Sequence, residues 1–349
     1  MLSSKNVEDK IRLCFVGPML GSNPGWVTTQ GEILADLFKK SGYKVWKTSS
    51  IPNRFLRLLD TVNSLITWRN YYDVAVISIF SGKAFIMADI SSMIVQSLNK
   101  PIIFCLRGGN LPEFSKRNYH WVERVLSRAD RIIAPSYYLA EFTSRFDKKA
   151  EIIPNILRIE EYPFRLREIL NLKLLWMRTF HEIYYPEMAV EVLAEVKKTY
   201  PGVKLTMAGQ EKGGLEAVQK IVRDKNLETE VRFAGFLDQE KKRKEFGSHD
   251  IFINTNRIDN MPVSVIEAAA FGLPVVATNV GGIPYLLKNN VTALLVDEGD
   301  IKSMADAVIR LFQHPYLASS LSLQGRILAE SCAWENVFRS WENVLYSLK

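Results

Sequence analysis

Residues 254–296 read NTNRIDNMPVSVIEAAAFGLPVVATNVGGIPYLLKNNVTALLV, and this stretch decides the fold. It holds an acid, Asp259, then a helix that Pro262 can begin and Gly272 can end, then an apolar strand and a Gly281-Gly282 loop. A helix N-terminus presents unpaired N–H groups and the positive end of the helix dipole. We therefore predict that the loop at 260–264 binds an anion such as a diphosphate.

The same stretch resembles the donor-binding region of the GT-B glycosyltransferases of the family 4 type. That family has an acid, seven residues and a Glu, followed by GLPV-like and GG-I-P sequences. Here the acids are Asp259 and Glu267, with GLPV at 272–275 and GGIP at 281–284. The first acid departs from the family, which usually has Glu there. The resemblance implies an α/β fold of two Rossmann-like domains that face each other across a cleft, with a C-terminal helix crossing back to the first domain.

The length of 349 residues suits two α/β domains of roughly 150 residues each. We predict an acceptor-binding domain over 1–156, a linker over 157–172, a nucleotide-sugar-binding domain over 173–330 and a final helix within 331–349. Residues 1–10 are polar and lack the apolar core of a signal peptide. No apolar run approaches the roughly 20 residues that span a bilayer.

Composition limits the cellular compartments and the kinds of partner that we expect. The three cysteines have no metal or redox spacing, which indicates buried free thiols in a reducing cytoplasm. The net charge of +7 and pI of about 9.1 suit anionic partners, but no nucleic-acid motif is present. We therefore expect no nucleic-acid binding.

Unbroken apolar runs at 11–16, 73–80 and 101–106 predict buried parallel strands of the first domain. Ligands bind outside the carboxyl ends of such strands. There, Arg107 and Asn110, with Gly109 between them, are predicted to contact the acceptor or a phosphate. The alternative for Arg107 is a structural salt bridge. Glu113 is the nearest candidate for a general base, and Gly25 is predicted to line the cleft rather than form an ordinary turn.

In the second domain, Arg178 follows a strand at 173–176 and fits the family's phosphate-binding arginine. Tyr184 stands where the family has a lysine. His181 or Lys212 could supply that charge, although a loop histidine is more often structural. The resemblance also implies that Glu267 accepts hydrogen bonds from ribose hydroxyls and that Asp259 contacts hydroxyls of the transferred sugar.

The other residues predicted to bind the donor lie in the loops after the strands and at the helix start; they are Gly209, Gln210, Lys212, Phe236, Leu237, Asn260, Met261, Pro262, Val263, Ser264, Gly281 and Gly282.

Two charged segments allow alternative interpretations. Residues 54–68 form a helix with a regular apolar face in a basic region. Either this helix docks on the sheet, which we prefer, or its basic, aromatic surface lies on anionic lipid headgroups. The run KKRK at 241–244 is predicted to be a solvated helix face rather than a binding tract.

The function implied by the resemblance is retaining transfer of a sugar, hexosyltransferase-like, from a nucleotide-diphospho-sugar to a glycan, lipid-linked or small-molecule acceptor. The donor is a co-substrate, so no cofactor is expected. The metal-binding D-x-D motif is missing, so we expect a metal-independent reaction in the cytoplasm, with possible peripheral contact at an anionic membrane face. Two alternatives remain open: a nucleotide-sugar epimerase of the same fold, and a non-catalytic nucleotide-sugar-binding protein.

Overall fold

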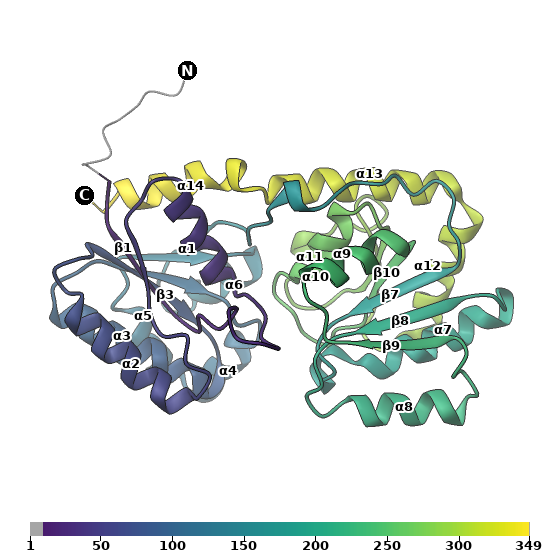
Figure 1. Ribbon diagram of the computed structural model, residues 1–349, viewed down its shortest axis with the longest axis horizontal. Coiled ribbons are helices and arrows are strands. Elements are labelled where there is room, and N and C mark those ends of the chain that lie inside the picture. The colour runs from purple at the N-terminus through teal and green to yellow at the C-terminus, as the bar shows by residue number, and fades with distance from the viewer. Residues whose placement is uncertain (1–9, 349) are drawn as a thin grey trace, which may run out of the picture. The chain divides into compact units, whose positions relative to one another are not determined.

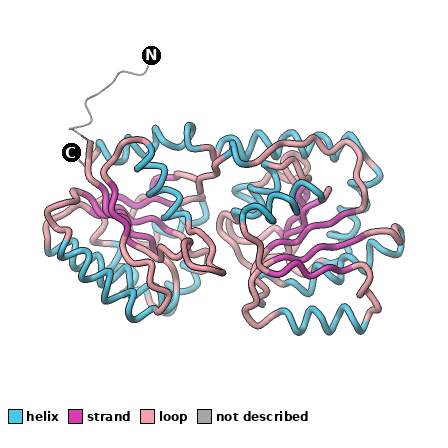
Figure 2. Tube along the Cα trace, viewed as in Figure 1, coloured by secondary structure: helices cyan, strands magenta, loops and turns pink. Residues whose placement is uncertain are grey.

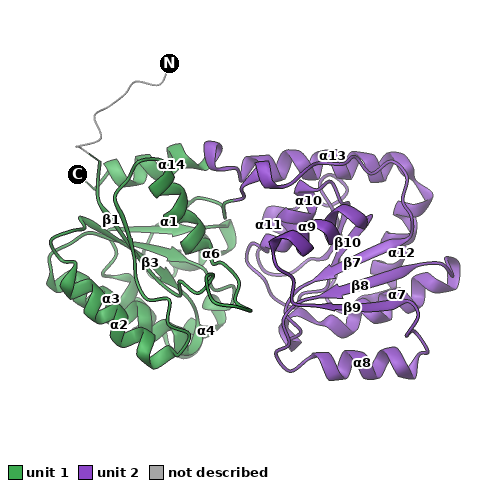
Figure 3. Cartoon of the chain, viewed as in Figure 1, with its two compact units in different colours: residues 1–156, 337–349 green, residues 157–336 purple. Residues whose placement is uncertain are grey.

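A computed structural model describes residues 10–348 as two compact α/β units (Figure 1). Unit 1 comprises Met1–Ile156 and Val337–Lys349, and unit 2 comprises Leu157–Asn336 (Figure 3). The stretch predicted to lack a signal peptide lies almost wholly outside the described residues. The segment predicted as a linker, 157–172, belongs to unit 2.

Unit 1 is built on a parallel six-stranded sheet in the order β2-β1-β3-β4-β5-β6. Its strands are β1 (Leu13–Val16), β2 (Val45–Lys47), β3 (Val74–Ile79), β4 (Ile102–Leu106), β5 (Arg131–Ala134) and β6 (Glu151–Ile152). All residues of β1, β3 and β4 are buried, as the unbroken apolar runs predict.

The helices of unit 1 lie on both faces of this sheet (Figure 2). They are α1 (Gln30–Lys40), α2 (Arg54–Thr67), α3 (Phe85–Ser97), α4 (Leu111–Arg117), α5 (Tyr119–Leu126), α6 (Tyr137–Ser144) and the last part of α14 (Trp334–Tyr346). Helix α14 packs on α1, where the ring of Trp341 meets that of Phe38 edge to face at 5.9 Å between centroids. In addition, the Tyr43 hydroxyl donates to Glu342 Oε1 at 3.2 Å.

Unit 2 repeats the architecture with a second parallel sheet in the order β12-β11-β10-β7-β8-β9. Its strands are β7 (Lys173–Met177), β8 (Lys204–Ala208), β9 (Val231–Gly235), β10 (Ile251–Asn254), β11 (Val275–Thr278) and β12 (Leu294–Val296). Its helices are α7 (Pro186–Thr199), α8 (Leu215–Asp224), α9 (Gln239–Ser248), α10 (Val263–Ala270), α11 (Ile283–Leu286), α12 (Ile301–Gln313) and α13 (Pro315–Ser331). The prediction of two Rossmann-like domains is confirmed.

Helix α2 begins one residue after Asn53, whose side chain accepts hydrogen bonds from Phe55 N and Leu56 N. Its apolar residues are divided between the interior and the surface. The buried residues are Arg57, Thr61, Ser64 and Leu65, of which only Leu65 is apolar. Phe55, Leu59 and Ile66 are 67%, 51% and 47% exposed. Leu65 lies in the core of unit 1, and Leu58 and Val62 are partly buried, so the helix docks inward with only part of its apolar residues.

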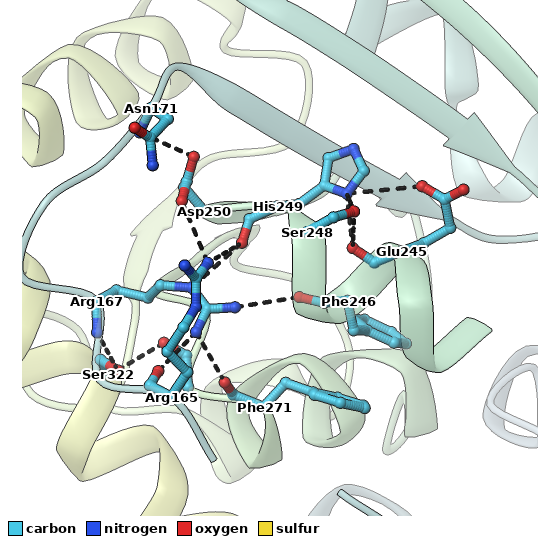
Figure 4. A network of polar contacts seen from close by, with 11 residues as sticks. Arg165, Arg167, Asn171, Glu245, Phe246, Ser248, His249, Asp250, Phe271 and Ser322 are labelled. Carbon is cyan, nitrogen blue, oxygen red and sulfur yellow. Dashed lines mark hydrogen bonds and ion pairs between the residues drawn. The ribbon is translucent and has the colours of Figure 1, made fainter. Parts of the chain in front are cut away.

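A buried arginine fixes the 157–172 segment to unit 2 (Figure 4). Arg167 is 1% exposed, and its guanidinium donates to four backbone carbonyls, those of Arg165, Phe246, His249 and Phe271. Its own N–H donates to Ser322 Oγ at 3.2 Å. Burial lowers the pKa of Arg167 to about 10, and nearby Arg165 acts in the same direction. One side chain thus ties the segment to α9, α10 and α13.

The three cysteines, Cys14, Cys105 and Cys332, are buried free thiols, as predicted. Within residues 10–348, no helix is both long and apolar enough to cross a membrane.

We expect Arg167→Ala to destabilise unit 2 by roughly 3 kcal/mol, because four buried carbonyls lose a charged donor. Urea unfolding followed by fluorescence measures this change. Arg165→Ala is the matched control: its side chain is 53% exposed, so its loss should be much smaller. Equal effects of the two substitutions would contradict the assignment of Arg167 as the anchor.

Candidate functional site

The predicted donor residues gather at the carboxyl ends of the strands of unit 2. Arg178 follows β7, Asn256 follows β10, and the Gly281-Gly282 loop follows β11. These strands are neighbours in one parallel sheet, so their carboxyl ends lie along the same edge. This edge is where open α/β sheets bind ligands.

Asp259 links all three strand ends. Its Oδ2 accepts from Arg178 Nη2 and from Asn256 Nδ2, the latter at 2.6 Å. Its Oδ1 accepts from Asn260 N at 2.8 Å, and its carbonyl accepts from Gly282 N at 2.9 Å. The structure therefore assigns Asp259 a contact that the sequence did not predict, namely a salt bridge that holds Arg178.

Arg178 has a second neighbour in Tyr184, the residue that stands where the family has a lysine. The guanidinium carbon lies 4.2 Å from the centroid of the Tyr184 ring, which is a cation–π contact. Arg178 Nε is buried and has no hydrogen-bond partner among the described residues. The tyrosine thus orients the arginine, and the guanidinium keeps N–H donors, that of Nε among them, for a ligand.

Helix α10 begins at Val263, directly after Pro262, as predicted. Ser264 lies in its first turn, and its Oγ is buried without a partner among the described residues. A buried hydroxyl at a helix N-terminus, five residues after Asp259, is suited to hydrogen-bond an anion.

Glycines at 209, 281 and 282 allow close approach of backbone to backbone. A Cβ on Gly281 would lie 2.2 Å from the Asp259 carbonyl oxygen, and one on Gly282 would lie 2.0 Å from that of Asn260. A Cβ on Gly209 would lie 1.7 Å from the carbonyl oxygen of Arg178. The sequence predicted that Gly281 and Gly282 let backbone approach a ligand. In the structure their nearest contact is instead the loop that carries Asp259.

Glu267 lies on α10 and is 3% exposed. Its Oε1 accepts from the Tyr162 hydroxyl at 2.9 Å and from Lys242 Nζ at 2.5 Å. Burial, and then the charge of Glu267, raise the pKa of the Tyr162 phenol, so it remains a donor. Oε2 accepts no hydrogen bond from the described residues, which leaves it for the predicted ribose hydroxyls.

The expectation of a solvated face at 241–244 is wrong for Lys242. Lys241 and Lys244 are exposed on α9, whereas the Lys242 side chain is 21% exposed and paired with Glu267. Lys242 precedes Phe246, the only buried residue of α9, by four positions. That spacing places both on the inner face of the helix and is the sequence signal that could have identified it.

The remaining donor candidates lie in the same unit, in the loops after β8, β9 and β10. Gln210 and Lys212 are joined to Phe180 by backbone hydrogen bonds of 2.8 and 3.1 Å. Phe236, after β9, is 39% exposed, whereas Met261 is 6% exposed. Leu237 is partly buried against the core cluster that contains α10.

His181 has a structural role. Its Nδ1 accepts from Ile183 N at 3.3 Å and so caps a short 3-10 helix, Glu182–Tyr184. That nitrogen is neutral when it accepts, so His181 is a poor replacement for the lysine.

The candidates of unit 1 follow β1 and β4. Gly25 has a positive φ of 78° in an exposed loop, and Gly109 and Asn110 precede α4. Arg107 Nη1 donates to Asn155 Oδ1 at 2.8 Å, and burial lowers the pKa of this arginine. Among the described residues it pairs with no carboxylate, unlike the structural salt bridge considered above.

Glu113 is a weak candidate for a base. It pairs with Lys116 at 2.6 Å, and this hydrogen bond lowers the pKa of Glu113. A general base that works near neutral pH needs the opposite shift.

The fold is that of an α/β protein with two Rossmann-like domains, and the predicted donor residues line one strand edge of the second. Residues 171–327 match the sequence model of the family described as "Glycosyl transferases group 1". Less than half of the chain thus resembles a group 1 glycosyltransferase domain, and the fold is that of the GT-B proteins. The finer assignment to family 4 stays a prediction.

Three known proteins illustrate the likeness. The amylovoran biosynthesis glycosyltransferase AmsK of Erwinia amylovora is 32% identical over 163 residues, 44% of this chain and 40% of that protein. A GDP-mannose-dependent alpha-(1-6)-phosphatidylinositol monomannoside mannosyltransferase of Mycobacterium tuberculosis is 28% identical over 146 residues, 39% of this chain and 37% of that protein. The match thus spans less than half of each of these relatives. The structure of Anabaena Alr3699/HepE in complex with UDP superimposes with a TM-score of 0.77 at 16% identity, covering 97% of this chain and 100% of that one.

We expect Lys242→Met to lower the free energy of unfolding by roughly 3 kcal/mol, because Glu267 stays buried without its counter-charge. Lys244→Met on the same helix is the control and should leave stability unchanged, since that side chain is 74% exposed. The double variant Lys242→Met with Glu267→Gln should recover most of the loss. Thermal and urea unfolding measure all three variants. An unchanged free energy of unfolding for Lys242→Met would contradict the pairing.

Proposed function

We propose that this protein transfers a sugar from a nucleotide-diphospho-sugar to a hydroxyl group of an acceptor. The observation that carries the proposal is the row of groups along one strand edge: the Arg178 guanidinium, the α10 N-terminus with Ser264, and the Glu267 carboxylate. Ser264 and Glu267 are three residues apart, so they share a helix face at about 4.5 Å of rise. A cation, a helix N-terminus and a hydrogen-bond acceptor in this order suit a diphosphate and the ribose attached to it.

We further propose that transfer retains the anomeric configuration. The acceptor oxygen bonds to the anomeric carbon as the bond from that carbon to the diphosphate oxygen breaks, and the leaving phosphate takes the acceptor proton. Both acids of the site already have cationic partners, Asp259 with Arg178 and Glu267 with Lys242. This pairing supports a reaction without a carboxylate nucleophile. Arg178 and the α10 N-terminus stabilise the charge that develops on the leaving diphosphate, which supports metal independence.

The acceptor is a glycan, a lipid-linked sugar or a small molecule. The mycobacterial relative is named for a phosphatidylinositol monomannoside, which supports a lipid-linked acceptor and peripheral contact with an anionic membrane. The UDP complex of the Anabaena protein and the GDP-mannose dependence in the relative's name make UDP- and GDP-sugars the first donors to test.

We expect Glu267→Ala to weaken nucleotide binding by roughly tenfold to a hundredfold, because the ribose hydroxyls lose a buried acceptor. Isothermal titration with UDP, GDP and their sugars measures the change. Glu240→Ala, an exposed acid on α9, is the control and should bind as the wild type does. If none of these ligands binds the wild type, the proposal fails.

Arg178→Gln should lower kcat by roughly a hundredfold or more, since it removes charge stabilisation of the leaving group. Product NMR with a panel of acceptors reports activity and anomeric configuration, with and without EDTA. Product formed from donor alone would indicate an epimerase. Donor binding without turnover on any acceptor would indicate a binding protein.

A further inference from the structure

Two neighbouring helices of unit 1, α2 and α3, both turn an apolar face outward. They pack against each other on the same side of the sheet (Figure 1). We call the set of exposed large apolar side chains on them the α2–α3 face: Phe55, Leu56, Leu59, Ile66, Ile86 and Met93. Single exposed apolar residues are normal on a protein surface, but six on two adjoining helices form a cluster.

Helix α2 buries Leu65 in the core of unit 1 but leaves other apolar residues exposed. Phe55, Leu59 and Ile66 recur along one face of the helix, and that face points away from the core. The inner face buries Arg57, Thr61 and Ser64 beside Leu65. The hydroxyls of Thr61 and of Ser91 on α3 are buried without a partner among the described residues. Burying unpaired hydroxyls costs free energy. Covering the outer apolar face offsets that cost, because removing apolar surface from water is favourable.

Positive charge borders this face. Arg54 begins α2, Arg69 follows its end, and Lys83 precedes α3; all three are exposed and form no ion pair with a described residue. Of the acids nearby, Asp60 on α2 is partly buried and forms no ion pair with a described residue, whereas two others are paired. Asp73 pairs with Arg12, and Asp89 pairs with Arg124 and Arg128.

Two aromatic residues follow the C-terminal end of α2. Tyr71 is 56% exposed, whereas Trp68 is partly buried and packs against the core of unit 1. Trp and Tyr favour the boundary between water and lipid, where a ring is buried while its polar atom stays hydrated. Apolar helix faces with basic residues and aromatics beside them are typical of helices that lie in a membrane interface.

We propose that the α2–α3 face docks this protein on an anionic lipid bilayer. The apolar side chains enter the headgroup region, and Arg54, Arg69 and Lys83 pair with anionic headgroups. A second copy of this chain fits the charges less well, because a symmetric contact would bring the same cations together. This inference rests on the proposed function, because docking would bring the glycosyltransferase to an acceptor held in the membrane.

Flotation of the full chain with vesicles tests the proposal. Wild type should float with phosphatidylcholine vesicles that contain phosphatidylglycerol, and less with phosphatidylcholine alone. High salt should weaken the binding, because salt screens the basic residues. Wild type that floats with neither kind of vesicle at low salt overturns the proposal.

The face is tested by Leu59→Glu with Ile66→Glu, which should lower vesicle partitioning by roughly tenfold or more through lost apolar burial and added negative charge. The matched control is Leu323→Glu with Ile327→Glu on α13, residues 47% and 52% exposed, which should float as the wild type does. Arg54→Gln, Arg69→Gln and Lys83→Gln together should reduce both the binding and its dependence on salt. Equal flotation of the Leu59/Ile66 variant and the wild type overturns the assignment of this face.

Two further measurements separate the remaining outcomes. Light scattering reports the oligomeric state. The proposal is overturned in favour of a contact between copies if wild type is a dimer that does not float and the Leu59/Ile66 variant is a monomer.

UDP and GDP titrations on the same samples report the donor site of unit 2, whose residues are untouched by these substitutions. Unchanged nucleotide affinity and melting temperature show that a loss of flotation does not come from misfolding. Loss of nucleotide binding by wild type would contradict the proposed function and leave the vesicle result standing.

Discussion

The site of unit 2 depends on the carboxylate of Asp259. This side chain joins groups that follow three neighbouring strands, because it accepts from Arg178 and Asn256 while its carbonyl accepts from Gly282 N. A carboxylate has about four acceptor positions. Oδ2 uses two for Arg178 and Asn256, and Oδ1 uses one for Asn260 N, so one remains on Oδ1 among the described residues. The residue therefore positions Arg178 and still has room for one hydroxyl of a sugar.

Glu267 divides its oxygens in the same way. Oε1 accepts from Tyr162 and Lys242, and Oε2 stays open to a ligand. In both acids, protein donors saturate one oxygen and thereby fix the orientation of the other. Groups held in place before a ligand arrives lose little entropy when it binds, and their dipoles need no reorganisation during reaction. The chain achieves this with two cation–carboxylate pairs instead of an excess of free charge.

Sequence reasoning identified the elements and the acids but missed their partners. The D-x7-E spacing, the glycines and the apolar runs predict strand ends, the start of α10 and two α/β domains, because these depend on local pattern. Lys242 and the stacking of Tyr184 on Arg178 depend on which way a side chain turns in the folded chain. Likewise, periodicity shows that residues 54–68 have an apolar face, but it does not show whether that face meets the sheet. Segment 157–172 was predicted as a linker from its charge, yet Arg167 buries one of those charges on backbone carbonyls.

The departure at Tyr184 follows from the same balance of charge. A second cation beside Arg178 would repel it. The face of the Tyr184 ring instead attracts the guanidinium, whose carbon lies 4.2 Å from the ring centroid. Asp259 then neutralises the arginine from another side, which lets a charge with only 19% of its side chain exposed persist without a large desolvation penalty. A diphosphate approaching this edge meets Arg178 Nε, Ser264 Oγ and the N–H groups that begin α10. Under the proposed function, recognition of the anion would thus come from oriented donors more than from net positive charge, because directed donors discriminate between ligands by geometry.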